Sequence, residues 1–134
     1  RLMEEGILSI ISINELKFKP EVNVVSAQSA MIEHESTEAY VVSDTDKYLG
    51  KLHLRSLILA NPKATVLDLI DPDALSIKLD ASIQQAIESA SNFIGETIPI
   101  IERDTNIFIG TVNEGDIFKM YLELQGQTID LEKR

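Results

Sequence analysis

The stretch IPIIERDTNIFIGTVNEGD, residues 98–116, decides the fold of this chain. Two apolar runs rich in β-branched residues, 98–101 and 107–112, flank a polar cluster that contains Asp104 and Asn106. Such runs, separated by turn-forming residues, predict a β-hairpin. Asn113 stands where the second run ends, and asparagine is favoured at helix N-termini. The stretch therefore predicts a hairpin followed directly by a helix.

An earlier stretch, EAYVVSDTDKYLGKLHLRS at residues 38–56, repeats this pattern. The offset between the two copies is constant at sixty residues (110 − 50 and 116 − 56). The aligned pairs are Asp44 with Asp104, Gly50 with Gly110, and Ser56 with Asp116. A fixed internal period indicates two copies of one supersecondary element.

The hairpin and the residues after it resemble the cystathionine β-synthase (CBS) domain, a small regulatory fold that occurs in tandem pairs. The resemblance rests on Pro99-Ile100-Ile101 and on Gly110-Thr111-Val112-Asn113-Glu114-Gly115-Asp116, which follow the family's proline-led strand and its Gly-x-x-[Ser/Thr]-x-x-Asp motif. It implies an α+β fold of two β-α-β-β-α repeats, related by a pseudo-twofold axis with clefts between them. We expect the first repeat with an N-terminal arm at 1–61, the second at 62–126 and a tail at 127–134.

Composition limits the classes of partner. With 134 residues and 44% hydrophobic residues, the chain can bury one core, either as a single domain or as two half-sized repeats. Twelve basic against 22 acidic residues give a net charge of −10, which would repel nucleic acid and anionic lipid. There is no cysteine, so disulfide frameworks and thiolate chemistry are excluded. No apolar run approaches the roughly 18 residues needed to span a bilayer.

Several local signals place the remaining elements. Ser12 with Glu15, and Thr65 with Asp68, have the spacing of capping boxes and predict short lead-in helices. We expect a strand at 22–25 and a helix capped by Ser26, matched in the second repeat by a strand at 76–79 and a helix capped by Asp80 or Ser82. Aligning Ala30 with Ala86 gives an offset of 56, so the first repeat is expected to lack about one helical turn, roughly four residues.

Two helices have clear patterns in the second repeat. Apolar residues at spacings of 3, 4 and 7 predict one buried helix face made of Ile83, Ala86, Ile87, Ala90 and Ile94. The last helix is expected to start at Asn113 and to end at Gly126, because glycine often follows a helix C-terminus.

Catalytic motifs are lacking in this sequence. His34 and His53 are far apart, and neither a Gly-x-Ser-x-Gly elbow nor a phosphate loop occurs. The paired acids Asp44 and Asp46, and Asp71 and Asp73, could bind a hard cation, although aspartate is also a turn former. We therefore expect no enzymatic activity and no metal site.

Resemblance to the family implies a nucleotide site in the second repeat. In CBS domains the acid of the motif, here Asp116, accepts hydrogen bonds from the ribose hydroxyls of an adenine nucleotide. The residue three before it, here Asn113 in place of Ser or Thr, lies near the ribose or phosphate. Ile77, Pro99 and Ile100 match the remaining pocket positions, which hold the base. Asn113 and Asp116 are also explained by a helix cap alone, so both interpretations stay open.

The corresponding positions of the first repeat are His53 and Ser56, which supply no carboxylate. One competent and one degenerate pocket are therefore expected. A nucleotide phosphate also needs a cation, and the candidates are Lys51, Arg55, Lys78 and Lys119.

The sequence thus predicts a cytoplasmic regulatory module that binds AMP, ADP or ATP and forms a homodimer. It would gate an upstream membrane transport domain of the same chain. The run Asp116 to Tyr121 is similar to the ending of chloride-channel pairs, which favours that parent, whereas 52–62 is more similar to the magnesium-channel pattern. A divalent-cation sensor and a ligand-free interaction module are the alternatives.

Overall fold

The structure, a computed structural model, describes residues 7–93 and 95–132, with the side chains of 127–132 left out. The chain forms two compact units, which are described separately. The first-repeat unit comprises 13–74 together with 104–108, and the second-repeat unit comprises the described parts of 1–12, 75–103 and 109–134. The predicted repeat boundaries stay predictions, because these packing units group the residues differently.

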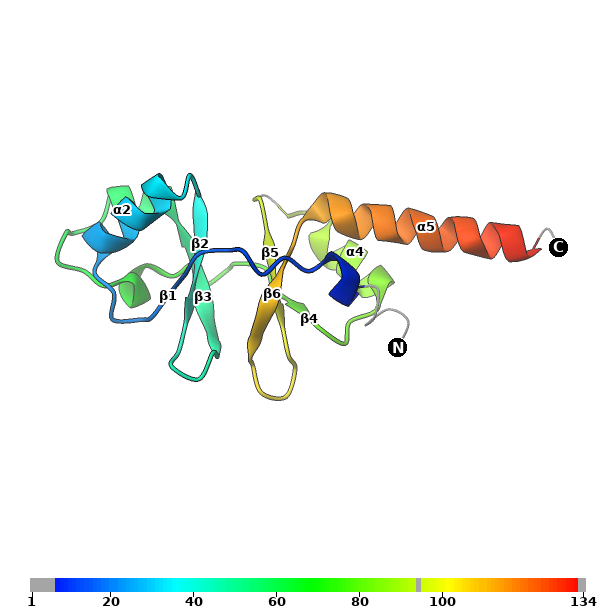
Figure 1. Cartoon of the computed structure of the whole chain (residues 1–134), viewed down its shortest axis with the longest axis horizontal. Coiled ribbons are helices and arrows are strands. Elements are labelled where there is room, and N and C mark those ends of the chain that lie inside the picture. Colours follow the sequence, from blue (N-terminus) through cyan, green and yellow to red (C-terminus); the bar gives the residue numbers. More distant parts are fainter. Residues whose placement is uncertain (1–6, 94, 133–134) are drawn as a thin grey trace. The chain divides into compact units, whose positions relative to one another are not determined.

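A three-stranded sheet of order β1-β2-β3 organises the first-repeat unit (Figure 1). β1 runs parallel to β2, with Lys17 opposite Tyr40, and β2 runs antiparallel to β3, with Val41 opposite Gly50. The elements in chain order are β1 (Lys17–Phe18), α2 (Val24–Glu33), β2 (Glu38–Val42), β3 (Tyr48–His53), α3 (Leu54–Ile58) and the 3₁₀ helix η1 (Val66–Leu69).

The second-repeat unit has the same arrangement, with a three-stranded sheet of order β4-β5-β6. β4 is parallel to β5, with Ile77 opposite Ile100. A short helical segment at 7–10 is followed by β4 (Ile77–Lys78), α4 (Ile83–Ala90), β5 (Ile98–Ile101), β6 (Phe108–Val112) and α5 (Glu114–Glu132). The hairpin followed by a helix and the α+β class are as predicted.

The spacing of sixty residues extends to the opening strand of each repeat. The paired residues Lys17 and Tyr40 correspond to Ile77 and Ile100 at that offset. The prediction that the first repeat lacks a helical turn is therefore wrong. It arose from aligning Ala30 with Ala86. The strand predicted at 22–25 and the Ser26 cap are also wrong, because α2 begins at Val24 and Asn23 caps it by accepting a hydrogen bond from the Val25 backbone N–H (2.8 Å).

The predicted lead-in helix after Ser12 is also wrong. Ser12 forms an isolated antiparallel bridge with Thr111, with reciprocal backbone hydrogen bonds of 2.8 and 2.9 Å. These bonds use the backbone groups that a helix start would need. The matching prediction at Thr65 is confirmed, since Thr65 and Asp68 form a capping box at the start of η1.

Helices α4 and α5 start where the sequence analysis predicts, but α5 ends later than predicted. Ser82 and Gln85 form a capping box at α4, and Ile83, Ala86 and Ala90 are buried as predicted; Ile94 lies outside the described residues. α5 does not end at Gly126 but continues to Glu132. A single glycine inside a helix costs only about 1 kcal/mol, so the helix formers that follow it can continue the helix.

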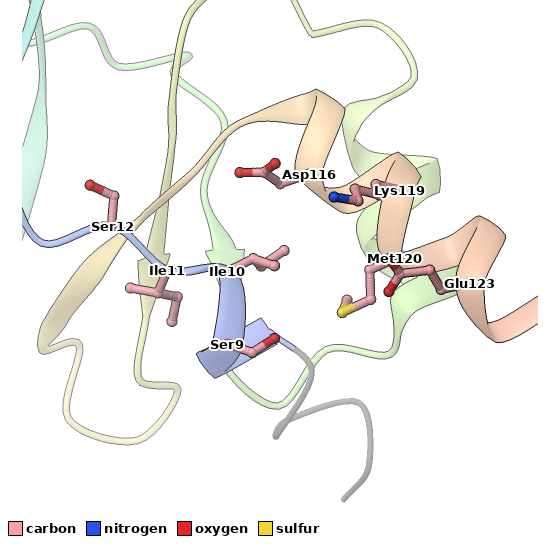
Figure 2. A pocket seen from close by; sticks show the side chains of 8 residues that line it. All are labelled: Ser9, Ile10, Ile11, Ser12, Asp116, Lys119, Met120 and Glu123. Atoms are coloured by element: carbon pink, nitrogen blue, oxygen red, sulfur yellow. The ribbon is translucent and has the colours of Figure 1, made fainter.

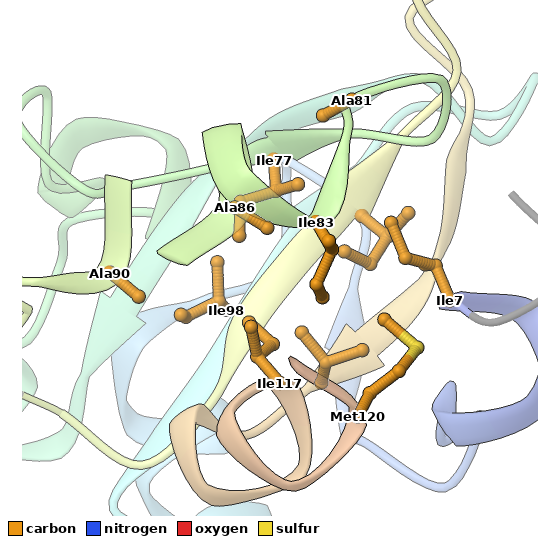
Figure 3. Packing of buried hydrophobic residues seen from close by; sticks show 11 residues of the cluster. Ile7, Ile77, Ala81, Ile83, Ala86, Ala90, Ile98, Ile117 and Met120 are labelled. Atoms are coloured by element: carbon orange, nitrogen blue, oxygen red, sulfur yellow. The ribbon is translucent and has the colours of Figure 1, made fainter. Parts of the chain in front are cut away.

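Each unit has its own hydrophobic core. In the second-repeat unit, side chains from the arm (residues 7–12), the sheet, α4 and α5 converge (Figure 3). This cluster comprises Ile7, Ile77, Ala81, Ile83, Ala86, Ala90, Ile98, Ile100, Val112, Ile117 and Met120. The core of the first-repeat unit comprises Val24, Ala27, Met31, Ala39, Val41, Leu52, Leu57 and Val66.

Two glycines at equivalent positions allow close approach of the backbone. A Cβ atom on Gly110 would lie 2.6 Å from the Ser12 carbonyl oxygen, and one on Gly50 would lie 2.7 Å from Ile70 Cβ. Real Cβ atoms do not occur at such distances. The arm therefore lies across β6, and residue 70 lies across β3, only because no side chain is present there.

Candidate functional site

The start of α5 positions the predicted site residue Asp116. Asn113 precedes the helix and accepts a hydrogen bond through Oδ1 from the Asp116 backbone N–H (2.7 Å). This cap satisfies one of the free amide groups at the helix start. It also places the Asp116 carboxylate in the first helical turn, where the helix dipole favours negative charge.

Asp116 lines a cleft of about 390 Å³ within the second-repeat unit. Figure 2 shows the two sides of this cleft, the arm on one and α5 on the other. The lining residues are Ser9, Ile10, Ile11 and Ser12 from the arm and Asp116, Lys119, Met120 and Glu123 from α5. The volume lies in the range of roughly 300–1,000 Å³ that is typical of small-molecule sites. The cleft combines apolar walls with polar and charged side chains.

Three of the other predicted site residues, Ile77, Pro99 and Ile100, lie in the sheet rather than in this cleft. Ile77 and Ile100 pair across β4 and β5, and both belong to the core, with exposed fractions of 3% and 1%. Pro99 precedes Ile100 in β5 and is also buried. The structure thus brings Asn113 to Asp116 and Ile77 to Ile100, but of the five predicted residues only Asp116 lines the described cleft.

Sequence reasoning missed the arm residues Ser9 to Ser12 as a wall of the cleft. The arm is held there by the bridge between Ser12 and Thr111 and by its close approach to Gly110. Gly110 was the available signal, because a glycine inside a strand marks a place where another backbone lies close. It does not say which segment approaches.

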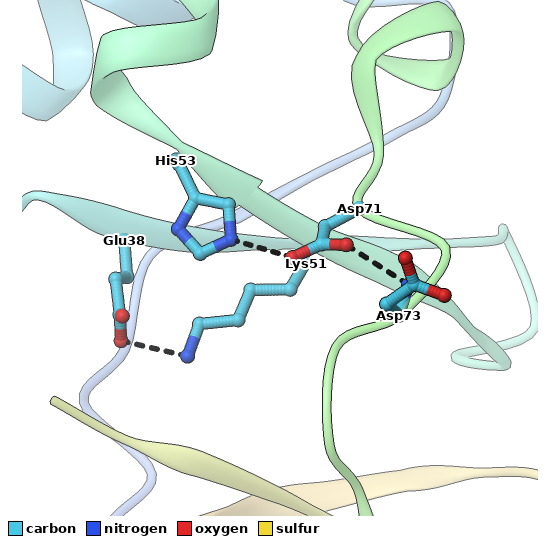
Figure 4. Close-up of polar contacts among 5 residues, drawn as sticks. All are labelled: Glu38, Lys51, His53, Asp71 and Asp73. Atoms are coloured by element: carbon cyan, nitrogen blue, oxygen red, sulfur yellow. Dashed lines mark hydrogen bonds and ion pairs between the residues drawn. The ribbon is translucent and has the colours of Figure 1, made fainter. Parts of the chain in front are cut away.

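An equivalent pocket of about 820 Å³ lies in the first-repeat unit. Residues 69–72 take the place of the arm, and His53, Arg55 and Ser56 take the place of residues 113–116. His53 Nε2 lies 2.9 Å from Asp71 Oδ2 (Figure 4). The pKa of Asp71 is lowered, first by the hydrogen bond from the Asp73 backbone N–H to its Oδ1 (2.9 Å) and then by His53.

An ion pair and an aromatic cluster also lie in the first-repeat unit. Lys51 Nζ lies 2.9 Å from Glu38 Oε1, and the two side chains are only 3% and 9% exposed. The ring of Tyr48 packs against Tyr40 and Phe108, with centroid distances of 6.3 and 6.0 Å. Burial, and to a lesser degree the charge of Asp71, raises the pKa of Tyr48 to about 12, so this phenol stays neutral.

The four candidate phosphate-binding cations have different surroundings. Lys51 is buried against Glu38, and Arg55 lines the first-repeat pocket. Lys78 lines a separate pocket with Arg103, whose Nε donates to both carboxylate oxygens of Asp80. Lys119 lines the cleft that Asp116 lines. If Asp116 holds a ligand, Lys119 is the cation in place beside it.

The acidic turns make structural interactions. Asp46 has a positive φ of 62°, as does its equivalent Asn106 at 63°. Aspartate and asparagine tolerate this left-handed conformation better than most residues. Within the described residues, no group of three or more His, Cys, Asp or Glu side chains is arranged to hold a metal ion.

Comparison with known proteins places this geometry in a known fold. Residues 66–123 match the CBS domain family. The CBS pair domain of a Shewanella oneidensis MR-1 protein described as an Mg²⁺ transporter superposes with a TM-score of 0.76 at 19% identity, covering 86% of this chain and 68% of that one. The chain has the fold of a CBS domain pair. The CBS pair fold that the sequence analysis recognised is confirmed.

Solved structures with this fold include complexes with nucleotides. The structure of CBSX2 in complex with AMP has a TM-score of 0.70 at 18% identity, covering 87% of this chain and 96% of that one. The cytosolic domain of the Mg²⁺ channel MgtE in complex with ATP also has a TM-score of 0.70, at 16% identity, covering 82% of this chain and 46% of that one. At these identities the likeness concerns the fold.

Among curated proteins, the chain is similar to the magnesium transporter MgtE of Thermus thermophilus. The two are 24% identical over 94 residues, which is 70% of this chain and 20% of the relative. The chain thus spans about a fifth of the length of that transporter. Among residues 7–93 and 95–132, no helix is both long and apolar enough to cross a bilayer. The comparisons support the magnesium alternative, and the chloride-channel parent stays an untested prediction.

Proposed function

We propose that this CBS pair is a non-catalytic regulatory module that binds an adenine nucleotide at the Asp116 cleft. Through this binding it would control an attached magnesium-transport domain from the cytoplasmic face of the membrane. Support for the ligand comes from the AMP and ATP complexes with the same fold. Support for the parent comes from the transporter relatives.

The observation that carries the proposal is the carboxylate of Asp116, which lines a small-molecule-sized cleft at a helix start. An ionised carboxylate can accept two hydroxyl hydrogen bonds, which suits a ribose. The apolar side chains of Ile10, Ile11 and Met120 offer a surface for the base. No comparable carboxylate stands at Ser56 in the first repeat.

Regulation follows if the nucleotide binds two arrangements of the module with different affinity. A ligand can shift an equilibrium between two arrangements only by the difference between its binding free energies for them. The arm and α5 form the walls of the cleft, so a bound nucleotide would contact both. We therefore expect the ligand to change the preferred positions of the arm and of α5.

Calorimetric titration of AMP, ADP and ATP into the whole chain tests the site. Asp116→Ala should weaken binding by roughly ten- to a hundredfold, because a hydrogen bond to a charged group is worth about 1.5 to 3 kcal/mol. Ser56→Ala is the matched control and should change the affinity little. Melting curves without ligand show whether Asp116→Ala acts through stability instead.

Two results would contradict the proposal. One is that no adenine nucleotide binds the wild-type chain, which would favour the ligand-free interaction module. The other is that Ser56→Ala impairs binding more than Asp116→Ala does. Homodimerisation, also expected from the resemblance, is tested separately by sedimentation equilibrium, and α5 leaves the large apolar side chains of Phe118 and Leu122 exposed for such a contact.

A further inference from the structure

The cleft around Asp116 carries more negative than positive charge. Among its eight described lining residues, Lys119 is the cation, while Asp116 and Glu123 supply two carboxylates. One positive and two negative side chains leave a net charge of −1. The whole chain adds a further negative background, with a net charge of −10. The field in the cleft is therefore unfavourable for an anion.

Lys119 has limited capacity to offset additional negative charge. It stands three residues after Asp116 and four residues before Glu123 on α5, and all three side chains line the same wall. Residues at these spacings are neighbours on a helix surface. The single ammonium group thus lies on the same wall of the cleft as two carboxylates. Sites built for polyphosphates instead offer several donors or a metal ion to the phosphate oxygens.

We propose that this cleft selects adenine ligands of low negative charge, adenosine or AMP, over ADP and metal-free ATP. The inference rests on the function proposed above and concerns the choice among ligands of that same site. Because Glu123 lines this small cleft, each additional phosphate of a ligand bound there would add at least one negative charge near that carboxylate. At the effective dielectric constant of a protein surface, such a repulsion weakens binding by about tenfold per phosphate at low ionic strength.

The test titrates adenosine, AMP, ADP and ATP into the whole chain in metal-free buffer of low ionic strength. AMP should bind at least about tenfold more tightly than ATP. In Glu123→Gln this ratio should fall several-fold, because the cleft then has no net charge. The control Glu88→Gln makes the same change to the net charge of the chain, but on α4 in a different pocket, and should leave the ratio unchanged.

The possible outcomes separate this inference from the proposed function. If ATP binds as tightly as AMP without metal, the charge selection is wrong while nucleotide binding stands. If Glu88→Gln lowers the ratio as much as Glu123→Gln, the selection comes from the overall charge and not from this cleft, and the inference fails. If no adenine compound binds at all, both proposals fail. Binding of ATP that is weak without Mg²⁺ and is restored by it supports the inference, because the cation neutralises the phosphates.

Discussion

Lys51 and Glu38 form the most deeply buried of the described ion pairs. Removing either charge alone should therefore destabilise the folded state. Glu38→Gln should destabilise the protein by about 3 to 5 kcal/mol, because it removes the negative charge that faces the buried Lys51 ammonium group. Combining Glu38→Leu with Lys51→Met should recover most of this loss, since neither charge then remains. Chemical denaturation measures both. A double variant as unstable as the sum of the single ones would contradict this account.

Asp71 makes the stability of the first-repeat unit depend on pH. Its pKa is lowered by the Asp73 backbone N–H and by His53, so the folded state favours the ionised form. A lowered pKa contributes stability that is fully present above the unfolded pKa of about 4 and is lost as the pH falls through the folded value. The melting temperature of Asp71→Asn should therefore lie below that of the wild type at neutral pH, and the gap should shrink below about pH 4.

Asp73→Asn is the control for this pH dependence. Asp73 donates its backbone N–H to Asp71, and the substitution keeps this group while it removes a carboxylate close to Asp71 in sequence. Its melting temperature should follow the wild type across the acid range. A gap between Asp71→Asn and the wild type that stays constant from pH 7 to about pH 3 would show that the carboxylate does not act through its charge.

At the scale of elements, Gly110 decides whether the arm can form its wall of the cleft. A side chain at this position would displace Ser12 and Ile11, whereas one at Gly50 would displace Ile70. Gly110→Val should therefore weaken nucleotide binding by about tenfold or more, or roughly 1.4 kcal/mol, and Gly50→Val by much less. Both should lose about 1 to 3 kcal/mol of stability through overpacking.

Calorimetry on the two glycine variants separates binding from folding, provided that both are measured below their melting temperatures. Equal losses of affinity in two folded variants would mean that the arm does not contribute to the site. The comparison is well matched, since Gly50 and Gly110 occupy equivalent positions at the offset of sixty and each faces one crossing segment.

At the scale of the whole molecule, neither sequence half contains a complete packing unit. The first-repeat unit needs Val66 from η1, which is fully buried in its core, and Phe108 from the second hairpin, which packs on Tyr40 at 5.2 Å. Truncation after Asn61 removes both. The fragment should lack a cooperative thermal transition, because it loses buried apolar groups that are each worth about 1.5 to 3 kcal/mol. A fragment that melts sharply would refute this.

Patterns within a few residues of the chain predicted the local elements well. The β-branched runs around Asp104 and Asn106 form the hairpin, and the apolar face of Ile83, Ala86 and Ala90 is buried. Asn113 precedes α5 and bonds to the Asp116 backbone. These features depend on backbone preferences and on groups that are close together in the chain, so they are visible in the sequence. The internal period of sixty likewise revealed that the element occurs twice.

The site itself depends on contacts that no local pattern contains. Ser12 was compatible with a capping box, and only its pairing with Thr111, 99 residues later (111 − 12), turns the arm into a wall of the Asp116 cleft. Ile77 and Ile100 pack in the hydrophobic core of the second-repeat unit, so neither lines that cleft. Which segments meet is determined by burial of apolar surface and by satisfaction of backbone hydrogen bonds over the whole fold. Only the tertiary structure could decide it.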